Sequence, residues 1–391
     1  MTRQLRVRIG RSTTVVVGRP ILAFFLIILW ALGTLPAAAQ QRIKVIVDQD
    51  ARGPGTSDQQ ALLVFLQSDK FDVLGITTVS GDQWAKEETQ HTLRTLEIAD
   101  RTDVPVIQGA EFPLLNSKEE AERWEQLYGQ LEYMGCWTDY FKAQRSTIYA
   151  IPYHSPDVVP PMPEGEPHIK AQPGTAAEFI VRMVHKYPGQ VVLWAGGPLT
   201  NYALALKLDP EVATLAKEFV MMGGGFYSDT GGIDPGAHDG RREFNWWFDP
   251  EAARIVLRAP WKKLTITPID ISVKTHLSPE IRAAIAKVKT PVTEYLDKYS
   301  LTGFMWDEIA GAALIDPSII TGEKQFYMDV DIDHGASYGK TLFWAPSAKV
   351  PPYLHLANVQ FDIDAPKFYK LYIDLMTRPP GQARESHASP Q

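Results

Sequence analysis

Three aspartates near the start of the chain have the type and spacing that metal-assisted chemistry needs. Asp48 and Asp50 directly follow a short β-rich run, and Asp58 comes eight positions after Asp50, across a loop containing Gly and Pro. Such close carboxylates repel one another unless a cation lies between them, and their oxygens suit calcium or magnesium better than zinc. Two interpretations are open: a metal site, or a solvated turn in which Ser57 or Asp58 caps the next helix.

The surrounding sequence alternates between strand and helix patterns. Apolar β-rich runs at residues 43–47, 71–79, 104–107, 191–194 and 219–222 predict strands, and helical spacing at 59–66, 87–99 and 176–185 predicts helices. This alternation predicts an α/β fold with a parallel sheet covered by helices. Ligands bind such sheets beyond the carboxyl ends of the strands, which is where Asp48 and Asp50 lie.

Residues 1–39 have the composition of an export signal. Five arginines precede an apolar run from Ile21 to Leu35, and Ala37-Ala38-Ala39 suits a signal peptidase. The apolar run is shorter than the ~20 residues of a membrane-spanning helix, which favours cleavage over a retained anchor. We therefore expect a signal peptide at 1–39 and a periplasmic or secreted mature protein.

Composition limits the partners. The chain has 391 residues, 45% of them hydrophobic, so it can bury a large core. Removing the five arginines of the leader, which contains no acid, changes the formal charge from -7 to -12. A negative surface argues against nucleic-acid and anionic-membrane partners. We expect a small-molecule ligand, no stable membrane anchor after cleavage, and possible assembly into a homo-oligomer. Cys136 is the single cysteine, so the fold has no internal disulfide.

Residues 40–377 are expected to form a single domain. Between residues 113 and 173 the regular pattern gives way to an aromatic, Pro-rich stretch, which we interpret as an elaborated loop or cap. The last residues, 378–391, are expected to be a disordered tail.

Several separated segments resemble, in order, the inosine-uridine-preferring nucleoside hydrolase family, with the leader suggesting a divergent, secreted bacterial-type member. The family's N-terminal signature resembles Asp48-Gln49-Asp50 followed by Ser57-Asp58. Further similar segments are residues 75–82, 104–110, 196–201, 221–225, 243–245, 249–253, and 306–307 with 316–317. The resemblance covers residues 43–377 apart from the cap. It implies an open, mostly parallel Rossmann-like sheet flanked by helices, nucleoside-hydrolase-like, with an aromatic cap insertion.

The resemblance also implies an activity: calcium-dependent hydrolysis of the N-glycosidic bond of a nucleoside or related N-riboside, with release of base and ribose. Asp50 would bind Ca²⁺ and take a proton from the attacking water. Asp58, the backbone carbonyl of Ala195 and the side chain of Asp307 would be further calcium ligands. The residues implied to bind substrate are Ser57, Asp82, Met222, Glu243, Asn245 and Trp306. Nearby carboxylates would stabilise an oxocarbenium-like transition state.

Three positions depart from the family pattern. Ser57 replaces an aspartate that grips a sugar hydroxyl, and Asp82 stands where the family usually has Asn. Trp306 replaces a His that protonates the leaving base in many members, and indole cannot act as an acid at neutral pH. Trp306 could instead stack on a base. Other proton donors, such as His238 or tyrosines of the cap, are not ranked by sequence.

Three further tryptophans could lie near the opening of the same substrate site: Trp84, Trp246 and Trp247. Ordinary packing explains them equally well. Met222 could likewise be plain core. His91 is expected to serve packing or the surface rather than catalysis.

Two other function classes compete with a hydrolase. One is a periplasmic nucleoside- or sugar-binding protein that has lost catalysis, which the changes at Ser57 and Trp306 permit. The retained set of Asp50, Asp58 and Asp307 favours the hydrolase, because a binder has no evident use for it. The other is a dinucleotide-dependent oxidoreductase, but the glycines at 223–225 do not fit that fingerprint.

Overall fold

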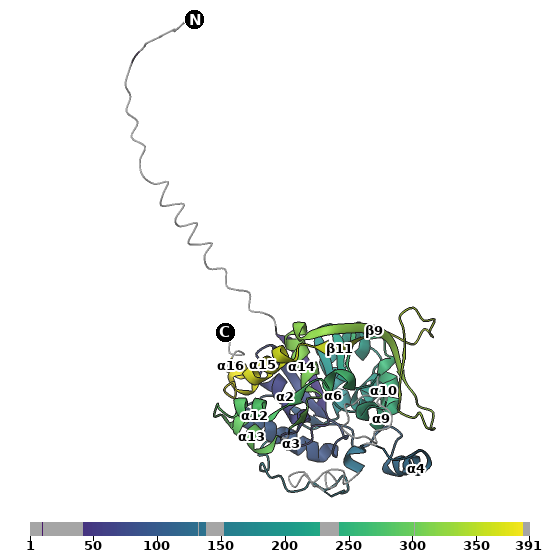
Figure 1. The fold of residues 1–391 in the computed structure, drawn as a ribbon, viewed down its shortest axis with the longest axis horizontal. Helices are drawn as coiled ribbons and strands as arrows, with labels where there is room; N and C mark the ends of the chain where they lie inside the picture. Colours follow the sequence, from purple (N-terminus) through teal and green to yellow (C-terminus); the bar gives the residue numbers. More distant parts are fainter. Residues whose placement is uncertain are drawn as a thin grey trace. The chain divides into compact units, whose positions relative to one another are not determined.

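A central sheet of nine strands organises the chain in a computed structural model (Figure 1). The structure describes residue 10 and residues 42–131, 133–137, 152–226, 242–300 and 302–385. In spatial order the strands are β10 (Thr341–Trp344), β9 (Ile320–Val330), β11 (Leu356–Ile363), β6 (Leu264–Thr267), β5 (Glu218–Met222), β4 (Val191–Ala195), β1 (Ile43–Gln49), β2 (Phe71–Thr78) and β3 (Val106–Gln108).

The sheet is mostly parallel, as the alternating sequence pattern predicts. Every pair from β11 through β6, β5, β4, β1 and β2 to β3 is parallel, whereas β9 is antiparallel to both β10 and β11. Parallel strands end at one edge of a sheet, so the loops that follow β1, β2, β4 and β5 all leave from the same edge.

Both faces of the sheet are buried along β4, β5 and β6, which explains the lack of polar–apolar alternation in these strands. In β1, Val45 and Val47 belong to one hydrophobic cluster and Ile46 to another. The helices of the first cluster are α2 (Ser57–Leu66), α3 (Ala85–Ile98), α12 (Pro279–Ile285), α13 (Pro291–Tyr299), α14 (Glu308–Ile315) and α15 (Ala365–Met376). Those of the second are α6 (Ala176–Lys186), α7 (Thr200–Leu208), α8 (Val212–Leu215) and α10 (Pro250–Leu257). The short remaining elements are α11 (Ile269–Ser272), β7 (His276–Leu277), β8 (Gly303–Phe304) and η2 (Pro317–Ile319).

The first part of the insertion at 113–173 contains a helix that the sequence pattern did not predict. This helix, α4 (Lys118–Tyr128), is capped by the hydroxyl of Ser117 and is followed by the 3₁₀ turn η1 (Gly135–Trp137). A small apolar cluster joins this part to α9 (Phe244–Phe248), where the ring of Trp137 stacks on Phe248 at 4.4 Å. Residues 132 and 138–151 of the insertion lie outside the described residues.

The second part of the insertion lies along α3 through paired acids and histidines. His91 on α3 lies between Glu87, also on α3, and Glu164 from the insertion. His154 from the insertion contacts the other oxygen of Glu87 at 3.1 Å. His91 is therefore a buried packing residue, as expected, and its contact with Glu164 connects the insertion to α3.

The predictions for the two ends of the chain can be compared with the structure only at the described residues. The leader, except residue 10, falls outside the described residues. None of the helices that are described has the length and apolar character needed to cross a membrane. The expectation of disorder after residue 377 does not hold for α16 (Gln382–Glu385), because Ala383 is buried and its carbonyl accepts a hydrogen bond from Arg42 at 2.8 Å.

Candidate active site

Asp50 lies just beyond β1, an interior strand between β4 and β2, and is 2% exposed. One oxygen, Oδ2, accepts a hydrogen bond from the backbone N–H of Asp82 at 3.1 Å. Two glycines make room for the carboxyl: a Cβ on Gly81 would lie 2.1 Å from Oδ2, and one on Gly197 would lie 2.7 Å from Oδ1. The loops after β2 and β4 therefore hold the Asp50 side chain from two sides.

Asp58 and Asp307 meet next to Asp50 although they come from opposite ends of the chain. Asp58 lies in the first turn of α2 and Asp307 directly precedes α14, and the charge of Asp58 raises the pKa of Asp307. Thr56 donates to Asp58 at 3.0 Å, and Gln49 donates to Oδ2 of Asp307 at 2.9 Å. The other oxygen of Asp307, Oδ1, is buried and has no hydrogen-bond partner among the described residues.

Burial makes this group of acids difficult to ionise. It raises the pKa of Asp50 well above its ordinary value, and the charges of Asp82 and Asp58 raise it further. Burial also raises the pKa of Asp307, with Asp58 as the next cause. For Asp58 the upward shift is opposed by the charge of Arg52. A cation among these carboxyls would favour their ionised forms.

The donor set fits a hard divalent cation. The side chains around Asp50 offer carboxylate oxygens rather than imidazole or thiolate ligands, and an unpartnered buried oxygen of Asp307 lies among them. Ala195 ends β4 opposite Asp48, so it stands at the same sheet edge. Asp50, Asp58, Asp307 and Ala195 could thus hold calcium, as the resemblance implies, or magnesium.

A tighter group of three ligand atoms, all within 4.8 Å of one another, lies elsewhere in the described chain, at His185, Asp209 and Glu211. Ordinary local contacts explain it: His185 pairs with Asp209 at 2.6 Å, and Asp209 accepts the backbone N–H of Glu211. By comparison, a cation between Asp50, Asp58 and Asp307 would have to draw the carboxyls closer together.

The same sheet edge carries Glu243, Asn245 and Met222. Polar groups of these residues already form hydrogen bonds within the protein. The carboxyl of Glu243 caps α9 by accepting backbone N–H bonds, including one from Asn245 at 2.8 Å. The amide nitrogen of Asn245 donates to the carbonyls of Gly196 at 2.8 Å and Met222 at 3.4 Å. Burial raises the pKa of Glu243 to about 7. These residues connect the loops after β4 and β5 beside Asp50.

Ser57 and Trp306, two of the departures from the family pattern, contact each other. The backbone N–H of Trp306 donates to the hydroxyl of Ser57 at 3.1 Å, and that hydroxyl donates to Glu308 at 2.9 Å. Burial raises the pKa of Glu308 to about 8. The indole of Trp306 is partly buried and lies 5.3 Å from the ring of Phe304, so stacking on a base stays a prediction.

The other tryptophans considered for base stacking are packing residues. Trp84 is 3% exposed and donates its ring N–H to the carbonyl of His154, while Trp246 and Trp247 are buried in hydrophobic clusters. His238, named as an alternative proton donor, lies outside the described residues.

Sequence reasoning missed several residues that surround the acids. Arg52 is 1% exposed, and its charge lowers the pKa of both Asp58 and Asp82. Tyr133, from the insertion, also lowers the pKa of Asp82. Glu308 was also missed, although the sequence contained an indication of its burial. It is the first residue of α14, a helix that is otherwise almost wholly apolar, and such a composition indicates burial on all sides.

Comparisons with known proteins point to one family. A profile described as inosine-uridine preferring nucleoside hydrolase matches residues 45–370. A probable uridine nucleosidase 2 of Arabidopsis thaliana is 31% identical over 290 residues, covering 72% of this chain and 78% of that protein. An inosine-uridine preferring nucleoside hydrolase of Leishmania major is 28% identical over 352 residues, covering 86% and 98%.

A solved structure supports the fold. The purine-preferring ribonucleoside hydrolase from Gardnerella vaginalis has a TM-score of 0.66 at 21% identity, covering 88% of this chain and 99% of that one. The related proteins are mostly eukaryotic, so a bacterial type stays a prediction. Because the family profile spans most of the chain, this protein belongs to the inosine-uridine preferring nucleoside hydrolase family and is an enzyme that hydrolyses N-glycosyl compounds.

Proposed function

We propose that this enzyme catalyses calcium-dependent hydrolysis of the N-glycosidic bond of a nucleoside or related N-riboside, releasing the base and ribose. The observation that supports calcium is that Asp50, Asp58 and Asp307 come together at the edge of the sheet beyond β1, where the buried Oδ1 of Asp307 has no hydrogen-bond partner among the described residues. When bound, calcium would lower the pKa of a water molecule and orient the sugar hydroxyls.

Asp50 is the proposed base. Its Oδ2 accepts a hydrogen bond from the Asp82 backbone, and Gly81 and Gly197 pack against its carboxyl, so the side chain is fixed in one orientation. A carboxylate fixed beside the proposed calcium is well placed to remove a proton from a metal-bound attacking water.

The sugar would be held by the groups around Asp50. The amide nitrogen of Asn245 is occupied by backbone carbonyls, so a sugar hydroxyl would meet its oxygen. Asp82 and Glu308 bring further carboxyls close to the ligand acids. Positive charge that develops on the sugar during bond cleavage would be stabilised by these carboxylates.

Export and assembly belong to the same proposal. The basic and apolar leader supports cleavage after Ala39 and a periplasmic or secreted enzyme, and homo-oligomer formation is compatible with a family enzyme of this size. N-terminal sequencing of the exported protein should begin at Gln40, and the mass in solution should exceed that of one chain.

The decisive experiment incubates the mature protein with a panel of purine and pyrimidine nucleosides, in calcium and in chelator, and measures the reducing sugar released. We expect release in calcium and little in chelator. An Asp50→Asn variant should keep the fold, measured by circular dichroism, and lose turnover. Ligand binding that ignores the chelator, with no product from any nucleoside, would instead identify a binding protein.

A further inference from the structure

The loop of residues 51–56, which connects the first two proposed calcium ligands, is held by side chains of α2. Gln59 and Gln60 are adjacent in that helix, and both are buried. The amide nitrogen of Gln59 donates to the carbonyl of Ala51 at 2.5 Å, and that of Gln60 donates to the carbonyl of Gly55 at 3.0 Å. The loop forms no strand ladder, so these side chains supply part of the bonding that a sheet partner would provide.

Each of the two glutamine amides is oriented by a hydroxyl from a neighbouring helix. The hydroxyl of Thr95 in α3 donates to the amide oxygen of Gln59, and that of Tyr372 in α15 donates to the amide oxygen of Gln60. Helix α2 lies against both α3 and α15 (Figure 1). Because each amide oxygen accepts from a hydroxyl, the amide nitrogens are turned the other way and face the loop.

Gly55 is held at both of its backbone polar groups. Its N–H donates to the phenol oxygen of Tyr295 in α13 at 2.7 Å, while its carbonyl accepts the bond from Gln60. Its φ of 67° favours glycine, and a Cβ there would lie 2.9 Å from the backbone of α13. Thr56 comes next, and its hydroxyl lies 3.0 Å from Oδ2 of Asp58. The position of Gly55 therefore bears directly on the second of the two ligands.

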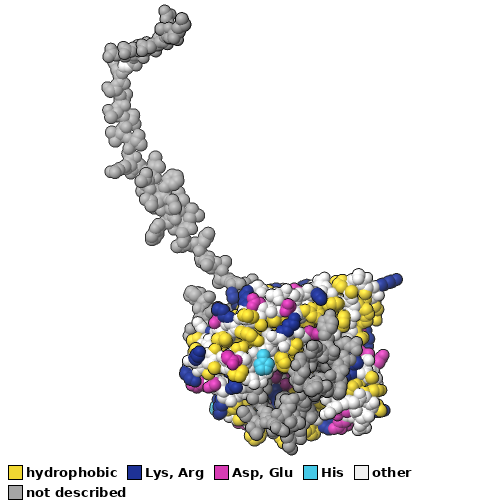
Figure 2. All heavy atoms as spheres, in the orientation of Figure 1, with side chains coloured by type: hydrophobic (Ala, Val, Ile, Leu, Met, Phe, Trp, Pro, Cys, Tyr) yellow, Lys and Arg dark blue, Asp and Glu magenta, His cyan; other side chains and the backbone are white. Residues whose placement is uncertain are grey.

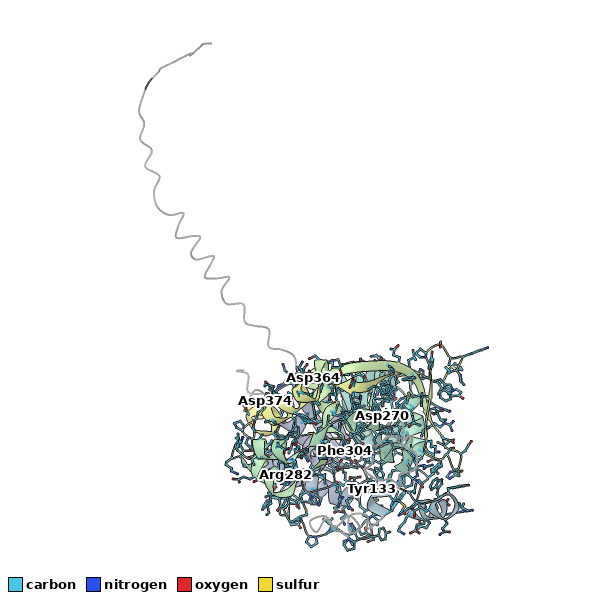
Figure 3. All side chains as sticks on the ribbon, viewed as in Figure 1. Tyr133, Asp270, Arg282, Phe304, Asp364 and Asp374 are labelled. Carbon is cyan, nitrogen blue, oxygen red and sulfur yellow. The ribbon has the colours of Figure 1, made fainter. Side chains whose placement is uncertain are left out.

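Helix α13 is fixed by contacts of its own. Arg282 of α12, labelled in Figure 3, donates to the carbonyl of Asp297 in α13 at 2.8 Å. One turn after Tyr295, the hydroxyl of Tyr299 donates to the carbonyl of Pro163 in the insertion at 2.5 Å. Through these hydrogen bonds the two tyrosines contact different parts of the chain, Tyr295 the loop and Tyr299 the insertion.

We propose that Tyr295 and Gln60 are positioning residues for the calcium site: by holding both backbone groups of Gly55, they fix the loop that connects Asp50 with Asp58, and with it the spacing of these two ligands. Neither side chain is expected to touch calcium or substrate. A loop that is already held does not have to be ordered by the ion, so calcium binds more tightly. This inference rests on the proposed function, from which it takes the identity of the ion.

The test compares Tyr295→Phe with Tyr299→Phe, the same substitution one helical turn later. Calcium is titrated by calorimetry into each mature protein after metal has been removed with chelator, and circular dichroism checks the fold. Tyr295→Phe loses one hydrogen bond that holds the loop, so its calcium Kd should rise about three- to tenfold. The Kd of Tyr299→Phe should equal that of wild type. The calcium concentration that gives half-maximal hydrolysis of a nucleoside should rise by the same factor as the Kd.

A second pair of variants tests the other bond to Gly55. Gln60→Met removes the amide but keeps a side chain of similar length, and Gln67→Met is the matched control. Gln67 is also buried and also donates to a backbone carbonyl, that of Arg378 at 3.0 Å, but it lies just after the far end of α2. We expect Gln60→Met to raise the calcium Kd and Gln67→Met to leave it unchanged.

The calcium Kd separates positioning from a purely structural role, which would lower the free energy of unfolding alike in each pair without changing the Kd. Equal calcium affinity within the tyrosine pair or within the glutamine pair would overturn the inference. A wild-type protein that binds calcium and shows the expected order of variants, but releases sugar from no nucleoside, would sink the proposed hydrolysis alone. A wild-type protein that binds no calcium would sink this inference together with the proposed calcium dependence.

Discussion

The hydroxyl of Ser57 donates a hydrogen bond to the carboxyl of Glu308, with 2.9 Å between the two oxygens, although the residues are 251 positions apart. Ser57 stands where the resemblance places an aspartate, so a carboxyl reaches the same neighbourhood from α14 instead. Because Glu308 is 1% exposed, it depends on donors inside the protein.

Removing that donor should destabilise the fold. We expect Ser57→Ala to lower the free energy of unfolding by about 1–3 kcal/mol, since a buried carboxyl loses a hydrogen-bond partner. Urea unfolding at neutral pH measures the effect, and Ser57→Thr, which keeps a hydroxyl, is the matched control. Equal stability of the alanine and threonine variants would show that the bond contributes nothing.

His91 should make stability depend on pH. Burial alone would lower its pKa, but the bonds to Glu164 and Glu87 outweigh burial and raise the pKa to about 9 from 6.5. The charged form is favoured by folding, so this stabilisation is complete below pH 6.5 and is lost as the pH rises through 9. His91→Gln should therefore cost about 3 kcal/mol at pH 6 and much less above pH 9.

The control for this prediction is His168→Gln, because the His168 side chain is 88% exposed. It should leave the free energy of unfolding unchanged at both pH values. A constant difference between wild type and His91→Gln from pH 6 to pH 9.5 would show that folding does not raise the pKa of His91.

Calcium should stabilise the folded enzyme by binding to it. At a free concentration one hundred times the Kd, the free energy of unfolding should rise by about 2.7 kcal/mol. Thermal unfolding in chelator and in calcium measures this rise, and Asp307→Asn should reduce it. Unfolding temperatures that are identical with and without calcium would speak against a calcium site.

Space around the proposed base should be as important as its charge. Gly81→Ala would place a methyl group 2.1 Å from Asp50 Oδ2, so the carboxyl must move. A displacement of this size should lower kcat/KM by about 100-fold. Gly303→Ala, where a Cβ would meet nothing within 4 Å, should retain activity. Full activity of Gly81→Ala would mean that the orientation of Asp50 is not critical.

Much of the fold was predictable because its signals are local. The β-rich run before Asp48 predicted β1, and the position of Asp50 at the end of that strand predicted its place at the ligand-binding edge of the sheet. The resemblance supplied Asp307, which no local pattern would link to Asp58. The distribution of surface charge does not reveal the site. On the face drawn in Figure 2, acidic and basic side chains are interspersed with apolar ones, whereas the acids of the site are buried.

The rest required tertiary contacts. Arg52 in a Gly/Pro loop has the sequence pattern of a solvated arginine, and only the fold brings it among buried acids. Tyr133 was one of several tyrosines in the insertion, and the docking of one turn on Gly81 distinguishes it. Glu243 had the pattern of a ligand-binding acid, yet its carboxyl caps α9, because the helix needs acceptors for its first N–H groups.

The placement of β1 between β2 and β4 has a consequence for how an ion would enter the proposed calcium site. Backbone amides of β1 are protected by ladders on both sides, so they should exchange with deuterium only when the whole sheet opens. Residues 51–58 have no such ladder. Asp50 therefore lies at the end of a protected strand, and any local opening that admits an ion should begin in the loop after it, whose amides should exchange sooner than those of β1.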